Sequence, residues 1–155
     1  MYKRQDLIGL RYFNIFGPKQ SPSGAYAAVI PLFMKAINND EFATINGNGE
    51  QTRDFTFVEN AVQANVKSFF ALNGAKNEIF NIACNNRISV NSLWEILNTK
   101  AKKDIKAEYG PSRPGDVKDS LADISKARKL LNYEPKFLVK EGLELTWNHF
   151  KTRNN

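Results

Sequence analysis

Three short polar clusters contain the residue types that could bind a phosphorylated ligand. They are Arg11-Tyr12-Phe13-Asn14, Arg53-Asp54 and Arg113-Pro114-Gly115-Asp116. The guanidinium group of arginine presents a planar fork of donors, which matches the oxygens of a phosphate or diphosphate. A carboxylate such as that of Asp116 accepts hydrogen bonds from two neighbouring hydroxyl groups, as on a ribose. The residue types in the clusters could therefore bind phosphate oxygens and the hydroxyl groups of a sugar.

Each cluster also has an interpretation that involves no ligand. Asn14 suits the cap of a turn ahead of Gly17-Pro18. Arg53 and Asp54 can form an exposed ion pair, which contributes little to stability. The segment 113–116 can be an ordinary solvated turn. The residue types by themselves leave these alternatives open.

The sequence lacks the glycine motifs that bind dinucleotides or nucleoside triphosphates. Neither G-x-x-G-x-x-G, nor G-x-G-x-x-G, nor a Walker A sequence occurs in it. Gly47-Asn48-Gly49 is a single G-x-G without a helical pattern after it. We interpret this segment as a hairpin turn between two short strands.

The sequence also lacks an obvious catalytic or metal-binding set. No tyrosine is followed by a lysine four positions later. Cys84 is the only cysteine, which excludes an intramolecular disulfide and a zinc site built from cysteines. His149 is the only histidine, so a histidine-based metal site or a Ser-His-Asp triad would depend on it alone. We assign no catalytic residue and no metal ligand.

The composition is that of one globular domain. The chain has 155 residues, of which 42% are hydrophobic and 25% are charged, enough for a real core. No apolar run approaches the roughly 18 residues that a membrane span needs. The N-terminal MYKRQDLIGL carries no apolar signal core. We expect a cytoplasmic protein without a membrane partner.

The net charge of +6 could attract phosphates or nucleic acid. The lysines, however, are spread along the chain, and the densest cluster, 100–106, ends a predicted helix, where cations are favourable. Neither a basic helix nor an aromatic platform for stacking bases accompanies this charge. We therefore expect no nucleic-acid partner.

Alternating apolar and amphipathic stretches predict an α/β fold that positions the polar clusters. Residues 7–13 and 78–83 read as buried parallel strands, and 43–47, 53–58 and 107–110 as shorter strands. Asn14 follows the first strand, and ligands of open α/β sheets bind beyond the carboxyl ends of strands. Two long strands are too few for a complete doubly wound sheet, so we expect part of an α/β protein.

Helical spacing of apolar residues predicts the remaining elements. One helix has Pro31 in its first turn, and another starts after Ser89, which suits an N-cap. Asp123 suits the cap of a third helix, and a fourth carries Val139, Leu143, Trp147 and Phe150. A fifth helix runs from residue 58 to residue 72, and its inward stripe comprises Val58, Ala61, Val62, Val66, Phe69 and Phe70.

The ordered set of motifs resembles the C-terminal half of an extended short-chain dehydrogenase/reductase of the NAD-dependent epimerase/dehydratase family. The stretches that carry the resemblance, from residue 10 to residue 117, are LRYFNIFGP, GAYAAVIP, INGNGEQTRDFTFVENAV, IFNIA and RPGDV. Within the family they look most like the UDP-N-acetylglucosamine 4-epimerases. The resemblance implies the C-terminal part of a Rossmann-type fold, about 7–14 and 78–83, plus the smaller nucleotide-sugar-binding domain, about 15–57 and 84–155.

The resemblance also implies roles for particular residues. Tyr12 and Phe13 would lie near the nicotinamide end of NAD. Asn14 would contact the diphosphate or the sugar of a UDP-sugar substrate. The remaining roles concern UDP itself: the uracil pocket would involve Val29, Thr44 and Asn46, the diphosphate would bind Arg53 and Arg113, and the ribose would bind Asp116.

Two departures from the family pattern limit what we expect of this chain. The family holds NAD on a G-x-x-G-x-x-G and transfers protons with a Tyr-x-x-x-Lys pair, and both are absent here. We therefore expect neither NAD binding nor epimerisation by this chain alone, and we expect self-association through cut sheet edges. A related dehydratase or decarboxylase, and a non-enzymatic UDP-sugar or nucleic-acid binding module, remain alternatives.

Overall fold

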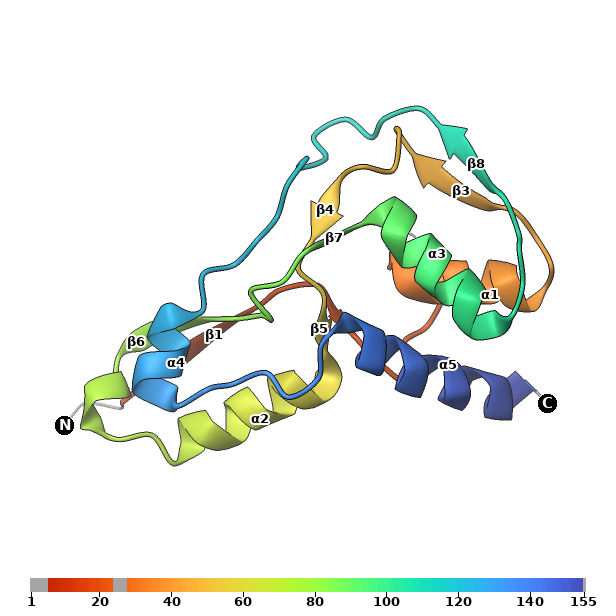
Figure 1. Cartoon of the computed structure of the whole chain (residues 1–155). Coiled ribbons are helices and arrows are strands. Elements are labelled where there is room, and N and C mark those ends of the chain that lie inside the picture. Colours follow the sequence, from red (N-terminus) through yellow and green to blue (C-terminus); the bar gives the residue numbers. More distant parts are fainter. Residues whose placement is uncertain (1–5, 24–27, 155) are drawn as a thin grey trace.

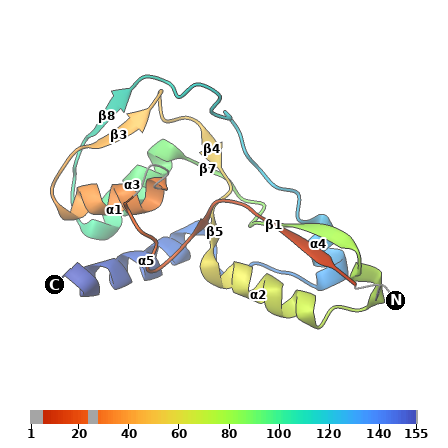
Figure 2. The same ribbon diagram turned by 180° about the vertical axis from the view of Figure 1, so that it is seen from behind.

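The computed structural model describes residues 6–23 and 28–154. Its elements form two groups, each around its own hydrophobic cluster, with short strands between them (Figures 1 and 2). We call the group that contains the longest strand pair the β1–β6 unit, and the group that contains two long packed helices the α1–α3 unit. The mixed helix and strand architecture confirms the predicted α/β class.

The β1–β6 unit is built on two parallel strands. Strand β1 (Ile8–Tyr12) pairs with β6 (Glu78–Ile82), in a register that aligns Leu10 with Phe80. Helices α2 (Val58–Phe69) and α4 (Ser125–Leu131) pack against these strands, and the short 3-10 helix η1 (Asn73–Ala75) contacts α4. The buried side chains of the unit include Phe80, Ile82, Leu131 and Tyr133.

The α1–α3 unit contains three helices and one strand pair. Helices α1 (Val29–Asn38) and α5 (Val139–Asn154) both contact α3 (Val90–Ala101), as Figure 1 shows. Helix α3 begins where expected, because the side chain of Ser89 accepts a hydrogen bond from the Ser92 backbone amide at 3.1 Å. Strand β3 (Ala43–Asn46) pairs in parallel with β8 (Ala107–Gly110).

Four two-residue strands connect the units. Strand β2 (Ile15–Phe16) pairs in parallel with β5 (Thr56–Phe57), and β4 (Thr52–Arg53) pairs antiparallel with β7 (Ile88–Ser89). The chain therefore leaves one strand pair and enters another within two residues, between β4 and β5. The segment after β8 runs back from the α1–α3 unit to α4 (Figures 1 and 2).

The hairpin predicted at Gly47-Asn48-Gly49 is wrong. Both glycines do make a tight turn, with φ of 69° and 74°. The strands that flank the turn do not pair with each other, because β3 pairs with β8 and β4 pairs with β7. The two glycines therefore do form a turn, as predicted, whereas the strands on either side of it pair with segments at least 35 residues further along the chain.

The apolar stripe predicted to face inward on α2 is largely exposed. The exposed fractions are 54% for Val62, 53% for Val66, 84% for Phe69 and 73% for Phe70. The buried residues of α2 are Asn60, Ala61 and Ala64, of which only Ala61 belongs to the predicted stripe. The helix also ends at Phe69, three residues before the predicted end. A two-stranded sheet is too narrow to cover a complete helix face, which leaves the stripe in solvent.

Candidate functional site

A cavity of about 640 Å³ opens between α1, β3, β4 and the loop that follows β8. This volume lies within the range of about 300–1,000 Å³ that small-molecule sites occupy. All seven residues predicted to bind the substrate line it: Asn14, Val29, Thr44, Asn46, Arg53, Arg113 and Asp116. Their roles toward a ligand remain predictions, but the fold brings residues from five different segments to one place.

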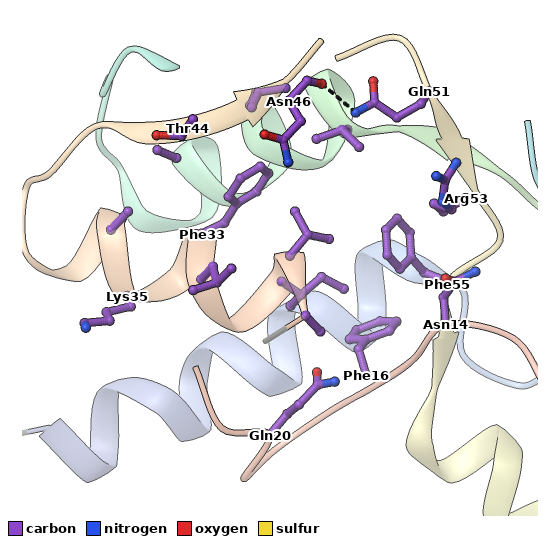
Figure 3. A pocket seen from close by; sticks show the side chains of 18 of the residues that line it. Asn14, Phe16, Gln20, Phe33, Lys35, Thr44, Asn46, Gln51, Arg53 and Phe55 are labelled. Atoms are coloured by element: carbon purple, nitrogen blue, oxygen red, sulfur yellow. Dashed lines mark hydrogen bonds between the residues drawn. The ribbon is translucent and has the colours of Figure 1, made fainter. Parts of the chain in front are cut away.

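Apolar side chains form much of the cavity wall. Phe33 from α1, Phe16 from β2 and Phe55 after β4 lie around it in Figure 3 and are at most 5% exposed. The ring of Phe33 meets the ring of Trp94 edge to face, at 5.0 Å between centroids. Because both rings are fixed by the core, this wall is preformed, as a flat base or sugar ring requires.

The polar side chains of β3 lie along one edge of the cavity. Thr44 and Asn46 alternate with the buried residues Ala43 and Ile45, as the period of an extended strand requires. Gln51 donates from Nε2 to the backbone oxygen of Asn46 at 2.9 Å (Figure 3). This hydrogen bond ties the glycine-rich turn to the end of β3 and places Gln51 among the lining residues as well.

Arg53 and Asp116 both line the cavity and form an ion pair with each other. The Arg53 side chain is 17% exposed, and its Nη1 also donates to the backbone oxygen of Thr52 at 2.7 Å. The loop that carries Asp116 is attached to β4 by two backbone hydrogen bonds, from the Thr52 amide to Lys118 and from the Ser120 amide to Thr52. These contacts place the exposed Arg113 at the same cavity.

Asn14 combines both interpretations that the sequence left open. Its φ of 38° is left-handed, so it does form a turn. Its Nδ2 donates to the backbone oxygen of Asp54 at 3.0 Å, and its own backbone oxygen accepts from the Thr56 amide at 3.2 Å. It also lines the cavity (Figure 3). The residue that forms the turn is therefore also a lining residue, and its contact with a ligand stays a prediction.

Tyr12 and Phe13, predicted to lie near the nicotinamide, are not among the cavity residues. The Tyr12 hydroxyl accepts a hydrogen bond from Asn65 Nδ2 at 2.8 Å on the surface of α2. Phe13 packs against the core of the β1–β6 unit. Their proposed contact with a cofactor stays a prediction.

The alternative that paired Arg53 with Asp54 at the surface is wrong. Asp54 is 0% exposed, and its carboxylate accepts backbone hydrogen bonds from Cys84 at 3.0 Å and from Ala122 at 3.3 Å. Burial raises the pKa of the Asp54 carboxyl group, and these amides partly oppose the rise. Burial also raises the pKa of the neighbouring Cys84 thiol to about 11, with a further contribution from the charge of Asp54.

Sequence reasoning missed Phe33, Phe55 and Gln51 as cavity residues. One signal in the sequence could have identified Phe55. It stands two positions after Arg53, so an extended backbone places both side chains on the same side. No comparable signal marks Gln51, whose position depends on how the glycine-rich turn meets β3.

Comparison with known proteins identifies the family. The family model described as GDP-mannose 4,6 dehydratase matches residues 2–146. The chain belongs to this family of NAD-dependent epimerases and dehydratases. It spans about half the length of the relatives that it matches, as the coverage figures below show.

Solved structures of family members superpose closely on the chain. The UDP-glucose 4-epimerase of Thermotoga maritima, solved with UDP-glucose, has a TM-score of 0.91 and 35% identity, over 97% of this chain and 47% of that one. The UDP-N-acetylglucosamine 4-epimerase of Methanobrevibacter ruminantium M1 was solved with UDP-N-acetylmuramic acid. It has a TM-score of 0.89 and 40% identity, over 96% of this chain and 47% of that one. The fold is therefore that of part of a Rossmann-type epimerase.

Relatives with different reactions match the chain as well. A UDP-glucuronate 4-epimerase of Thermodesulfobacterium geofontis is 38% identical, over 94% of this chain and 43% of its own length. A UDP-N-acetyl-α-D-glucosaminuronate decarboxylase of Bacillus cytotoxicus is 28% identical, over 94% of this chain and 46% of its own length. The UDP-glucuronic acid 4-epimerase of Bacillus cereus was solved with UDP-glucuronic acid and NAD. It has a TM-score of 0.85 and 31% identity, over 93% of this chain and 45% of that one. NAD is thus the cofactor of intact family enzymes.

Among the described residues, no helix has both the length and the apolar character needed to cross a membrane. In the same part of the chain, no cluster of three histidine, cysteine or acidic side chains is arranged to hold a metal ion.

Proposed function

We propose that this chain forms the UDP-sugar-binding part of an NAD-dependent UDP-sugar 4-epimerase. The observation that supports this most directly is the convergence of Asn14, Arg53, Arg113 and Asp116 on one cavity. A diphosphate carries about two negative charges, and two arginines at one opening supply charge-assisted hydrogen bonds for them. The apolar wall of the cavity would then contact the uracil ring, and the polar side chains of β3 would bind its polar groups.

Ligand binding under this proposal requires Asp116 to change its partner. In the structure Asp116 pairs with Arg53. A diphosphate that binds Arg53 would replace this carboxylate, and Asp116 would then accept hydrogen bonds from the ribose hydroxyls. Because Asp116 lies on an exposed loop, such a shift needs no rearrangement of the core.

The proposed sugar is glucose or N-acetylglucosamine, with the 4-epimers galactose and N-acetylgalactosamine as products. Support comes from the names of the similar epimerases and from the motifs 22–31 and 44–55. Decarboxylation of a UDP-uronic acid is the second candidate, because a decarboxylase matches the same part of the chain.

We propose that the residues which the structure describes do not form a complete NAD site by themselves. The sequence contains no dinucleotide-binding glycine motif, Phe13 packs into the core and Tyr12 bonds to Asn65. NAD supplies the hydride acceptor in intact family enzymes, and no step through it is derived for this chain. We propose that the chain alone binds the nucleotide sugar without converting it.

Titration calorimetry with UDP and with UDP-N-acetylglucosamine tests the proposal. We expect both to bind, an oligonucleotide not to bind, and Arg113→Ala to abolish binding of the UDP-sugar. Lys118→Ala is the matched control, because it removes a cation from the same exposed loop outside the cavity lining. Unchanged affinity in Arg113→Ala would contradict the proposed site.

The claim of inactivity is tested separately. The chain is incubated with UDP-N-acetylglucosamine and NAD, and the 4-epimer is sought by chromatography. Turnover at about 1 per second or more, a rate typical of enzymes, would show that the chain is complete as a catalyst.

A further inference from the structure

Asp54 occupies the point where the chain passes from one strand pair to another. Arg53 ends β4 and Thr56 starts β5, so only Asp54 and Phe55 connect the two. Arg53 and Phe55 line the cavity, whereas Asp54 between them does not. An extended backbone alternates its side chains in this way, so the Asp54 carboxylate points toward the protein interior behind the cavity.

Asp54 joins three segments that are distant in sequence. Its Oδ1 accepts from the Cys84 amide at 3.0 Å, just after β6, and its Oδ2 accepts from the Ala122 amide at 3.3 Å, ahead of α4. Its backbone oxygen accepts from Asn14 Nδ2 at 3.0 Å. One residue thus connects the β1–β6 unit to two residues of the cavity, Arg53 by the peptide bond and Asn14 by this hydrogen bond.

The segment that donates to Asp54 is itself held in place. Tyr133 donates from its hydroxyl to the Ala83 backbone oxygen at 2.9 Å. Asn60 Nδ2 donates to the Cys84 sulfur at 3.6 Å and to the Phe137 backbone oxygen at 2.6 Å. All three polar side chains, Asp54, Asn60 and Tyr133, are at most 1% exposed. Buried polar groups of this kind are costly unless every partner is present, so the network favours one backbone geometry.

We propose that Asp54 is a positioning residue for ligand binding. Its carboxylate fixes the backbone between β4 and β5, so that the Arg53 guanidinium and the Asn14 amide face the cavity, and it acts on the ligand only through them. The ligand class, a nucleoside diphosphate, rests on the proposed function.

A double-mutant cycle tests this role against a purely structural one. Asp54→Asn keeps the size of the side chain but replaces one acceptor by a donor, which then faces a backbone amide. We expect it to weaken UDP binding by about tenfold or more, because a misplaced Arg53 would lose its hydrogen bond to the diphosphate. A hydrogen bond to a charged group usually contributes about that much. In an Arg53→Ala background the same substitution should cost less than about threefold, because only its effect through Asn14 then remains.

Asp123→Asn is the matched control. Asp123 also accepts a backbone hydrogen bond, from the Ser125 amide at 2.8 Å, but it is exposed and lies outside the cavity lining. It should leave UDP affinity unchanged. If UDP binds and the effects of Asp54→Asn and Arg53→Ala are additive, the positioning role is wrong while the proposed function stands.

A measurement without ligand keeps the two proposals separate. In ¹⁵N NMR spectra, Asp54→Asn should shift the Arg53 Nε and Asn14 Nδ2 resonances, and Asp123→Asn should not. Unshifted resonances would overturn the positioning role, whether or not UDP binds. Failure of UDP to bind would contradict the proposed function, whatever the resonances show. If Asp54→Asn does not fold, Tyr133→Phe takes its place, because it removes the hydrogen bond to the Ala83 backbone oxygen. This variant should shift the Arg53 Nε resonance. An unshifted resonance would overturn the positioning role of Asp54 in the same way.

Discussion

Arg53 and Asp116 are 63 positions apart in the sequence and form an ion pair at the cavity. The pair joins the end of β4 to the loop after β8, the two segments that the proposed function assigns to the diphosphate and the ribose. Under the proposed function, the same two side chains would bind adjacent parts of UDP, so the ligand would replace the ion pair.

Asp116→Ala should affect UDP and pyrophosphate in opposite directions. The substitution removes the acceptor for the ribose hydroxyls, so UDP binding should weaken by about tenfold. It also frees Arg53 from its carboxylate, so pyrophosphate should bind more tightly, by up to about fivefold, the value of a partly exposed ion pair. Calorimetry with both ligands measures this, with Lys118→Ala as the control. Weaker binding of both ligands would show that Asp116 only orients Arg53.

Gly49→Ala should destabilise the fold. Gly49 has a φ of 74°, and an added Cβ would lie 1.9 Å from Asn91 Oδ1. Asn91 donates to the Asn48 backbone oxygen at 3.0 Å, so moving it breaks the contact between the glycine-rich turn and α3. We expect a loss of about 1–3 kcal/mol in the free energy of unfolding, measured in urea.

Gly74→Ala serves as the control for that measurement. No atom lies within 4 Å of a Cβ added there, and Gly74 does not have a positive φ. Its effect should stay within about 0.5 kcal/mol. Equal effects of the two substitutions would mean that the turn geometry at Gly49 is not required.

The buried Cys84 thiol predicts a loss of stability at alkaline pH. Its pKa is raised from 9.0 to about 11, so the unfolded chain loses the thiol proton at a lower pH than the folded chain does. Stability from this group is complete below pH 9 and falls as the pH rises toward 11. Between pH 8 and pH 10 the free energy of unfolding should fall by about 1 kcal/mol more in the unaltered chain than in Cys84→Ala. An equal fall in both would contradict the raised pKa.

Self-association remains a prediction. The exposed apolar stripe on α2 is the surface through which we expect two copies of the chain to associate. Val62, Val66, Phe69 and Phe70 are all at least 53% exposed, beside the β1 strand. We expect a second copy to cover them, since exposed apolar surfaces and strand edges favour pairing. Sedimentation at about 100 µM should show a dimer or larger species, consistent with mass action.

Phe69→Glu should return the chain to a monomer in that experiment. Leu145→Glu, at an exposed apolar position on α5 in the other unit, is the control and should not. A monomeric unaltered chain would contradict the prediction.

The sequence determined most of the elements, because their signals are local. Pro31 lies in the first turn of α1, Ser89 caps α3, and the apolar positions Val139, Leu143 and Trp147 are buried on α5. These features depend on helix geometry and capping, which act over a few residues. The strands at 78–83 and 107–110 were also predicted within one residue of their positions.

The sequence by itself also determined the family and seven of the residues that line the cavity, through an ordered set of short motifs. Only the tertiary structure decided how these residues are paired. It placed Arg53 against Asp116 instead of Asp54, buried Asp54 under the amides of Cys84 and Ala122, and left the α2 stripe in solvent. Such pairings join segments that are tens of residues apart, and they depend on which backbone groups and surfaces the folded chain brings together, which residue types and spacing do not specify.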